Sequence, residues 1–306
     1  MSPVVIEKLE LDPATLGEGP HWHSEEGVLY MVDIENYTII KYDRTTRKHI
    51  KAKLEEKPHF ILPIEGKKDH FLVTQGRKVV EIEWTADENP PKILRTVTEV
   101  DKEYPKNVLN DGKADPLGRL FTGCLSEETT PGSKKTGSLY RIDSDGTTTK
   151  LATDIVASNG LCWDLKEKAF YYIDSLSSAI QGYDYDVETG NISNPRIAFS
   201  LIDNGLKGYP DGMTIDTDGN LWVAVFGGSN VLKIDPRKKK LLETIDMPVP
   251  QVTSVTFGGP NLDMLYVTTA CLDFNGKPDP PSGTTYAVTG ISARGHPNLK
   301  VRLDYN

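Results

Sequence analysis

The chain has 306 residues and carries 35 Lys and Arg against 44 Asp and Glu, which gives a formal net charge of −9 at pH 7. An acidic chain with no basic stripe is not expected to bind nucleic acid or an anionic membrane surface. Its 26 Gly and 20 Pro favour many turns over long helices, and the lack of a glycine period or a heptad repeat excludes collagen-like and coiled-coil folds. We expect residues 1–306 to form a single all-β domain.

The cysteines indicate a reducing environment. Cys124, Cys162 and Cys271 are odd in number and widely spaced, and no Cys-x-x-Cys motif occurs. This pattern argues against a disulfide scaffold or a zinc ribbon, so the cytoplasm is the predicted location. Residues 1–13 contain no basic segment before a long apolar run, and no window of about 18 apolar residues exists. Neither a signal peptide nor a membrane span is therefore predicted.

A turn followed by an apolar, aromatic strand recurs along the chain, beginning at residues 26–33. Later copies occupy residues 69–74, 117–122, 168–174, 218–224 and 262–268. One anchor residue marks the middle of each copy, and successive anchors lie 42 to 51 positions apart: Tyr30, Leu72, Phe121, Tyr171, Trp222 and Tyr266. Self-similarity at a period of this size indicates a repeat architecture.

A second strand follows most anchors and ends in a turn, as in residues 39–43, 138–143 and 230–235. Alternating apolar residues behind Asp, Gly, Pro and Thr turns are typical of β-hairpins. Six units of about 50 residues, each with about four short strands, predict an all-β, six-bladed β-propeller. A pair of β-sandwiches is the alternative, but sandwiches do not usually repeat at this period. Residues 4–9 are expected to pair with the last blade and close the ring.

Four of the six units carry an acidic or amide residue at the same step, 11 or 12 positions before the anchor. These residues are Glu18, Asn110, Asn159 and Asp211, and each is followed by Gly or by Asp-Gly. Equivalent positions of successive blades are related by rotation about the channel axis, so their oxygens are expected to converge at one mouth of the channel. The other two units offer apolar or small residues at this step: Phe60 or Ile61, and Ser254 or Val255.

Two carboxylates and two amide oxygens at one point predict a central metal site with one divalent cation. Asp, Glu and Asn oxygens suit Ca²⁺, Mg²⁺ or Mn²⁺, and Zn²⁺ also accepts carboxylates. The simpler interpretation is that Asn-Gly and Asp-Gly are turn dipeptides, which explains one such pair better than four in register. Asp33 and Asp174 end anchor strands and are expected to hold neighbouring loops. His21 and His23 share one face of a strand, but no third His lies nearby to complete a site.

The same residues carry a resemblance to a known family. The matching segments are residues 17–22, 110–116, 158–161, 171–175, 210–216 and 253–259. Together they resemble the SMP-30/regucalcin/gluconolactonase family, which includes luciferin-regenerating enzyme, over residues 16–290. The resemblance implies a six-bladed propeller with one catalytic divalent metal in its channel, held by Glu18, Asn159 and Asp211.

The resemblance also implies an activity, the hydrolysis of lactones or related esters by a monomeric enzyme acting on a small molecule. Asp211 would be catalytic, either taking the proton of the attacking water or orienting that water. Asn110 and Glu128 would lie on the substrate side, with Glu128 in a Thr-, Pro- and Gly-rich loop. The alternative function is a calcium-binding regulatory protein with little or no catalytic activity, since the same oxygen cluster serves both.

One position departs from the family pattern. The family commonly has an Arg two residues before the substrate-side Asn, and this chain has Val108 there. A guanidinium offers five fixed donors for sugar hydroxyls, and Val offers none. We therefore expect Val108, as part of the substrate-binding surface, to favour less polar lactones or esters over sugar lactones. Lys106 is one residue that could replace the missing Arg.

Overall fold

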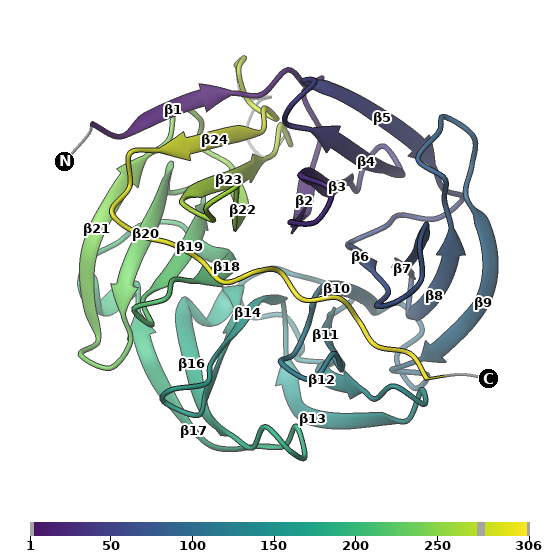
Figure 1. The fold of residues 1–306 in the computed structure, drawn as a ribbon. Helices are drawn as coiled ribbons and strands as arrows, with labels where there is room; N and C mark the ends of the chain where they lie inside the picture. The colour runs from purple at the N-terminus through teal and green to yellow at the C-terminus, as the bar shows by residue number, and fades with distance from the viewer. Residues whose placement is uncertain (1–2, 274–278, 305–306) are drawn as a thin grey trace.

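The computed structural model describes residues 3–273 and 279–304, which form six four-stranded antiparallel sheets around a central axis (Figure 1). This arrangement confirms the predicted six-bladed, all-β propeller. The described helices are two short 3₁₀ turns, η1 (Ser175–Ser177) and η2 (Ile202–Asn204). No helix in the described part of the chain is long and apolar enough to cross a membrane.

Each blade begins with its innermost strand and continues outward through consecutive hairpins. Blade one contains β2 (Gly17–His23), β3 (Val28–Asp33), β4 (Thr38–Asp43) and β5 (Lys48–Lys53). Blade two contains β6 (Ile61–Pro63), β7 (His70–Gln75), β8 (Lys78–Glu83) and β9 (Lys92–Glu99). Blade three contains β10 (Val108–Ala114), β11 (Leu120–Leu125), β12 (Gly137–Ile142) and β13 (Thr148–Ile155). Blade four contains β14 (Ser158–Asp164), β15 (Ala169–Asp174), β16 (Ala179–Tyr185) and β17 (Ile192–Ser200). Blade five contains β18 (Tyr209–Ile215), β19 (Leu221–Phe226), β20 (Asn230–Asp235) and β21 (Lys240–Asp246).

The sixth blade closes the ring with strands from both ends of the chain. It contains β22 (Val252–Gly258), β23 (Met264–Thr269), β24 (Tyr286–Thr289) and, outermost, β1 (Val5–Lys8). β1 pairs antiparallel with β24, from Val5 opposite Thr289 to Lys8 opposite Tyr286. Figure 1 shows β1 and β24 side by side at the edge of the ring. The predicted closure by residues 4–9 is thus confirmed.

The hydrophobic core is divided among the interfaces between blades. Six buried clusters occur among the described residues, one for each pair of neighbouring blades. The six anchors lie in the second strand of each blade, and all are buried. An inner strand such as β22 is buried along its whole length, whereas the outermost β21 alternates between exposed and less exposed residues. The anchors therefore recur because each blade must cover the next.

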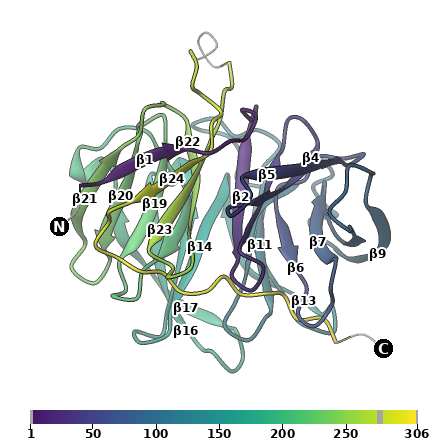
Figure 2. The ribbon, with the colours of Figure 1, turned by 45° about the horizontal axis from the view of Figure 1, so that its top comes forward.

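The residues after β24 cross one end of the channel, and we call residues 290–304 the C-terminal strap. Gly295 donates to the carbonyl of Leu262 in blade six, and Val301 donates to that of Pro63 in blade two. Arg302 donates to the carbonyl of Gly118 in blade three. In Figure 2 the strap and the residues directly before β24 (279–285) lie at opposite ends of the ring. The strap thus covers one mouth of the channel only.

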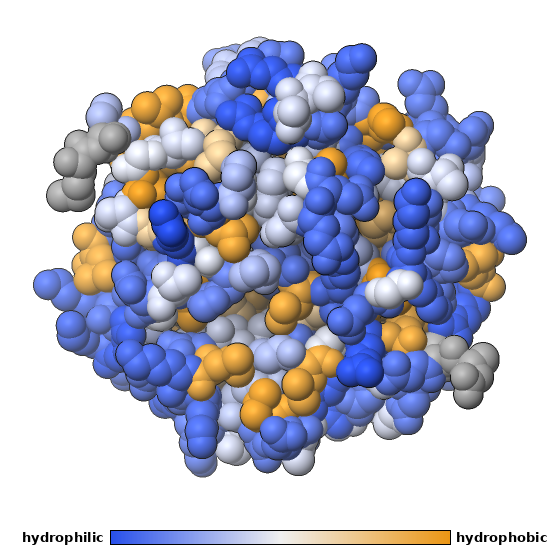
Figure 3. Space-filling model, in the orientation of Figure 1, coloured by the Kyte–Doolittle hydropathy of each residue, from blue (hydrophilic) through white to orange (hydrophobic). Residues whose placement is uncertain are grey.

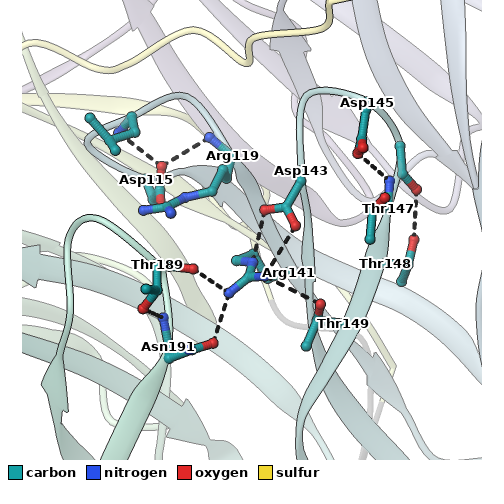
Figure 4. Close-up of polar contacts among 12 residues, drawn as sticks. Asp115, Arg119, Arg141, Asp143, Asp145, Thr147, Thr148, Thr149, Thr189 and Asn191 are labelled. Carbon is teal, nitrogen blue, oxygen red and sulfur yellow. Dashed lines mark hydrogen bonds and ion pairs between the residues drawn. The ribbon is translucent and has the colours of Figure 1, made fainter.

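A buried ion pair of blade three, formed by Asp115 and Arg119 (Figure 4), is hydrogen-bonded to blade four at the strap end. Asp115 Oδ2 lies 2.6 Å from Arg119 Nε and accepts a hydrogen bond from the Tyr185 hydroxyl at 2.7 Å. Asp115 Oδ1 also accepts the backbone N–H of Arg119 at 2.9 Å. Arg119 donates further to the Glu188 carbonyl in the β16–β17 turn. Every oxygen of this buried carboxylate therefore has a partner.

Replacing Asp115 by Ala is expected to lower the free energy of unfolding by about 3–5 kcal/mol, because Arg119 would remain buried without its counter-charge. Urea unfolding followed by tryptophan fluorescence measures the change. The control is Asp184→Ala, which breaks the ion pair with Arg196 at about 50% exposure of both side chains. That exposed pair should contribute less than about 1 kcal/mol. Equal effects of the two substitutions would contradict the assignment of a blade-joining role to Asp115.

Candidate metal centre

The innermost strands share an irregularity at one level of the channel. Pairing with the second strand shifts register between Glu18 and His21, between Leu109 and Gly112, between Ser158 and Leu161, and between Pro210 and Met213. A β-bulge of this kind bends the strand and re-aims side chains. The bulge in β2 lies directly after Glu18. The bulges in the other three strands contain Asn110, Asn159 and Asp211. The structure therefore brings all four to the same level.

Glycines at the bulges let neighbouring inner strands approach closely. A Cβ atom on Gly160 would lie 2.6 Å from the carbonyl oxygen of Asp211, and one on Gly212 would lie 2.0 Å from Ser254 Oγ. Any larger residue at either position would push the strands apart. Gly160 and Gly212, which follow Asn159 and Asp211, thus have a packing reason beyond turn formation.

Two strand-end carboxylates fix the segments that lead into the site. Asp33 accepts the backbone N–H groups of Thr15 and Leu16, both at 3.1 Å, just before β2. Asp174 accepts the N–H of Val156 at 3.2 Å and of Ala157 at 2.9 Å, just before β14. The expectation that Asp33 and Asp174 hold neighbouring loops is confirmed. Through these bonds they position the strands that carry Glu18 and Asn159.

Hydrogen bonds orient the two amides. Asn159 Nδ2 donates to Ser175 Oγ at 3.0 Å, so Oδ1 is the acceptor atom of this amide. Asn110 Nδ2 donates to the Ser158 carbonyl at 2.8 Å and lies 3.4 Å from Asn159 Oδ1. Asn110 Oδ1 lies 2.7 Å from His59 Nδ1. Burial lowers the pKa of His59 to about 4, so the ring is neutral at pH 7 and donates from Nδ1 to this oxygen.

The carboxylates of the site are buried and repel one another. Burial, with the charge of Asp111 as the next cause, raises the pKa of Glu18 to about 8. Burial raises the pKa of Asp211 well above its usual range, and the charges of Glu18 and Asp111 raise it further. Burial also raises the pKa of Asp111. Such a cluster is costly to keep ionised without a cation.

Asp111 lies beside the predicted ligands, and one of its oxygens has no partner. Its Oδ1 accepts the Gly112 N–H at 2.8 Å. Its Oδ2 is buried and has no hydrogen-bond partner within the described part of the chain. Buried polar atoms in native proteins are nearly always satisfied. The unsatisfied oxygen of Asp111 is therefore an acceptor that a cation, or water held by one, could use.

Lys113 supplies one positive charge to the cluster. Its charge lowers the pKa of both Glu18 and Asp111, and its ammonium group donates to the Met213 carbonyl. Glu18, Asp111 and Asp211 carry three negative charges when ionised. Lys113 balances one of them, so a divalent cation would balance the other two.

The donor set fits a divalent cation that prefers oxygen ligands. Glu18 Oε2 accepts the Gly19 N–H at 3.0 Å, which leaves Oε1 for a metal. Within the described ranges, no three His, Cys, Asp or Glu side chains converge closely enough to hold a metal by themselves. The amide oxygen of Asn159 is therefore needed beside Glu18 and Asp211. Carboxylate and amide oxygens of this kind suit Ca²⁺, Mg²⁺ or Mn²⁺, and Zn²⁺ with carboxylates.

The remaining predicted residues lie nearer the open end of the channel. Val108 begins β10 and pairs with Leu125. Glu128 is exposed in the β11–β12 loop, and no contact joins it to the carboxylate cluster among the described residues. Its charge acts on Lys106, which forms an ion pair with Glu127. The structure thus separates Glu128 from the residues that it brings together around Glu18.

Sequence reasoning missed three residues of the site. Asp111 directly follows Asn110. Because the repeat step is 11 or 12 positions, counting back from the anchor does not decide which of the two residues faces the channel. The bulge between Leu109 and Gly112 brings both of them there. His59 directly precedes Phe60, the position that the register offered for blade two. Lys113 carries no signal of its own in the sequence, because its role depends on the direction in which β10 continues below the bulge.

The chain is similar to known proteins over almost its whole length. A family model described as SMP-30/Gluconolactonase/LRE-like region matches residues 16–271. Regucalcin of Xenopus laevis is 36% identical over 300 residues, which cover 96% of this chain and 97% of that protein. The solved structure of a luciferin-regenerating enzyme superimposes with a TM-score of 0.93 at 40% identity, covering 98% of this chain and 100% of that one. A calcium-binding protein, regucalcin, from Agrobacterium tumefaciens shares the fold with a TM-score of 0.86 at 23% identity, over 98% of both chains.

Proposed function

The chain belongs to the SMP-30/gluconolactonase/LRE-like family, and from this membership we propose that it is a divalent-metal-dependent hydrolase of lactones or related esters. The observation that carries the proposal is the buried cluster of Glu18, Asn159 and Asp211 with its raised carboxyl pKa values. A site that concentrates an excess of negative charge inside a protein is a candidate functional site. Its oxygen donors are those of a hard-cation centre.

In the proposed mechanism, Glu18, Asn159 and Asp211 hold the ion. A bound divalent ion supplies Lewis acidity, which polarises the ester carbonyl and lowers the pKa of water. Asp211 receives the proton of the attacking water at a carboxylate oxygen and returns it to the leaving alkoxide, or uses that oxygen to orient the water. His59 holds Asn110, and Asn110 in turn lies against Asn159 Oδ1. These bonds keep the amides rigid while the proton moves.

Substrate preference is proposed to follow from the open end of the channel. Val108 offers an apolar surface where the family commonly has a guanidinium, so a lactone or ester with an apolar body should fit better than a sugar lactone. Glu128 is proposed to reach substrate from its exposed loop. The chain is further proposed to act as a monomer in the cytoplasm; the location is proposed from the odd number and wide spacing of its cysteines.

Introducing the family's Arg tests the role of Val108. Val108→Arg is expected to raise kcat/KM for gluconolactone, relative to an unsubstituted aliphatic lactone, by about tenfold, because charge-assisted hydrogen bonds to the hydroxyls become available. Steady-state hydrolysis of both substrates with the same metal gives the ratio. Val108→Met is the matched control, since it adds length without donors. An unchanged ratio in the Arg variant would refute the specificity role of position 108.

A second candidate function is a calcium-binding regulatory protein with little or no catalysis. The specific observation in its favour is Val108, which removes a substrate contact and leaves the metal-binding oxygens intact. The relative named regucalcin and the solved calcium-binding neighbour point the same way. Tight binding of Ca²⁺ without turnover of any lactone or ester would favour this candidate over the hydrolase.

The hydrolase proposal is tested by restoring metals to the metal-stripped protein. The substrates are gluconolactone, an unsubstituted aliphatic lactone and an aryl ester, each with Ca²⁺, Mg²⁺, Mn²⁺ or Zn²⁺. We expect metal-dependent turnover that is greatest for the apolar substrates. Metal binding without turnover on the whole panel would reject the hydrolase for these substrates and leave the regulatory protein.

A further inference from the structure

A cavity lies below the metal centre, at the opposite end of the channel from Val108. Its volume is about 390 Å³, within the range of small-molecule sites. The hairpin turns after β10, β14 and β18 and the C-terminal strap form its walls. Most of its wall is apolar, including Leu62, Ala114, Pro116, Ile215 and Pro297. Glu18, Asn159 and Asp211 do not line it, whereas Lys113, which balances charge at the metal centre, does.

The inner end of this cavity carries polar groups with unused hydrogen-bonding capacity. His21 is 4% exposed, and its Nε2 has no hydrogen-bond partner within residues 3–273 and 279–304. Lys113 also lines the cavity, and the Met213 carbonyl takes only one of the three N–H groups of its ammonium. A buried ring nitrogen without a partner is uncommon in native proteins. Both groups therefore point to a ligand or to water.

The order of residues along the inner strands separates this cavity from the metal centre. His21 follows Glu18 by three positions on β2, and Lys113 follows Asp111 by two on β10. At a rise of about 3.3 Å per residue, the polar end lies about 7–10 Å below the ligand level. The strap lies beyond it, where Asn298 accepts a hydrogen bond from Thr256 Oγ1 at 2.8 Å. Access is thus from the strap face.

Apolar side chains also surround the mouth on that face. Leu165 is 54% exposed and Leu299 is 43% exposed, and both line the cavity. Figure 3, which looks onto the strap face, shows apolar side chains gathered next to its centre. The site therefore offers an apolar route from solvent to a polar floor, the arrangement that suits a ligand with one polar end.

We propose that this cavity is a second ligand-binding site, which takes a small amphipathic molecule with its apolar body against Leu62, Ile215 and Leu299. The head of that molecule is a carboxylate or carbonyl that accepts hydrogen bonds from the Lys113 ammonium at the cavity floor. The proposal concerns binding alone and does not depend on hydrolysis at the metal centre.

Calorimetric titration with linear carboxylates, in the presence of Mn²⁺, tests the site. Octanoate is expected to bind saturably at one molecule per chain, and affinity should rise about fourfold per methylene from hexanoate to octanoate. Thr214→Phe, which fills the inner end of the cavity, should weaken octanoate at least tenfold. Lys113→Met should weaken octanoate about tenfold, because a charge-assisted hydrogen bond is lost.

The controls separate this site from the metal centre and from loss of folding. Thr244→Phe places the same substitution on exposed β21 and should leave octanoate affinity unchanged. Asn159→Ala disrupts the metal centre and should also leave it unchanged, which excludes octanoate bound to the metal. Quenching of tryptophan fluorescence by 8-bromooctanoate should fall in Trp163→Phe, since Trp163 lines the cavity. No saturable binding by wild-type protein, or binding lost in Asn159→Ala and kept in Thr214→Phe, would overturn the proposal.

Discussion

Replacing Asp211 by Asn is expected to reduce metal-dependent kcat by about 10³-fold, within the range for loss of a group that transfers protons. The substitution keeps the size of the side chain and removes both a charged ligand and the proposed proton acceptor. It should also stabilise the metal-free protein, because Asp211 is buried beside Glu18 and Asp111 and its ionised form is disfavoured there. Activity and metal-free stability should therefore move in opposite directions.

Steady-state kinetics at saturating metal and thermal unfolding in chelator measure the two effects. Asp184→Asn is the matched control, because it makes the same change at an exposed residue far from the channel. It should alter neither kcat nor the metal-free melting temperature appreciably. A variant at position 211 that keeps wild-type turnover would remove Asp211 from the mechanism. One that loses both turnover and metal-free stability would mark it as a structural residue.

The stability of the metal-free protein is expected to decrease as the pH rises from about 4.5 to about 8. Glu18 has a pKa of about 8 in the folded protein and a reference value of 4.5. Between these values the folded state binds more protons than the unfolded state, so the free energy of unfolding falls with rising pH. Below pH 4.5 both states are protonated and the contribution is constant. The decrease should be on the order of a few kcal/mol.

Bound metal should reverse this dependence, because the ion takes the place of protons on the same carboxylates. Binding at pH 7 is therefore expected to release at least one proton, and metal affinity should increase with pH. Calorimetry in buffers of different ionisation enthalpy counts the protons. Glu18→Gln should flatten the metal-free stability profile between pH 5 and 8. A wild-type profile that rises over this interval would contradict the raised pKa of Glu18.

The fold was predictable because the propeller repeats one physical requirement six times. Each blade must cover the apolar face of its neighbour. Large apolar residues such as Tyr30, Phe121 and Trp222 therefore recur at a similar spacing, even though the loops between the strands differ in length. The same rotation relates Glu18, Asn159 and Asp211, which is why counting back from the anchors located them. Closure by the N-terminal strand followed from an apolar segment that lay outside the six repeats.

The rest of the site depends on features that a repeat count does not contain. The bulge in β10 brings Asp111 to the channel beside Asn110, and a one-residue choice of this kind follows from backbone pairing. His59 acts through a hydrogen bond that spans two blades. The cavity above the strap needs turns from three blades and a segment that crosses the ring. Glu128 was proposed through family resemblance. It lies in an exposed loop, so counting along the repeated strands could not have located it.

The most direct test of the account is a titration of metal against hydrolysis, with metal-stripped protein at a concentration well above its metal dissociation constant. Hydrolysis of an aliphatic lactone or aryl ester is measured after each addition of Mn²⁺ or Zn²⁺. The account predicts that activity rises linearly with added metal and reaches a plateau at one equivalent per chain. In Asn159→Ala the sharp change from rise to plateau at one equivalent should disappear. Full hydrolysis before any metal is added, or none at saturation with any of the four ions, would contradict it.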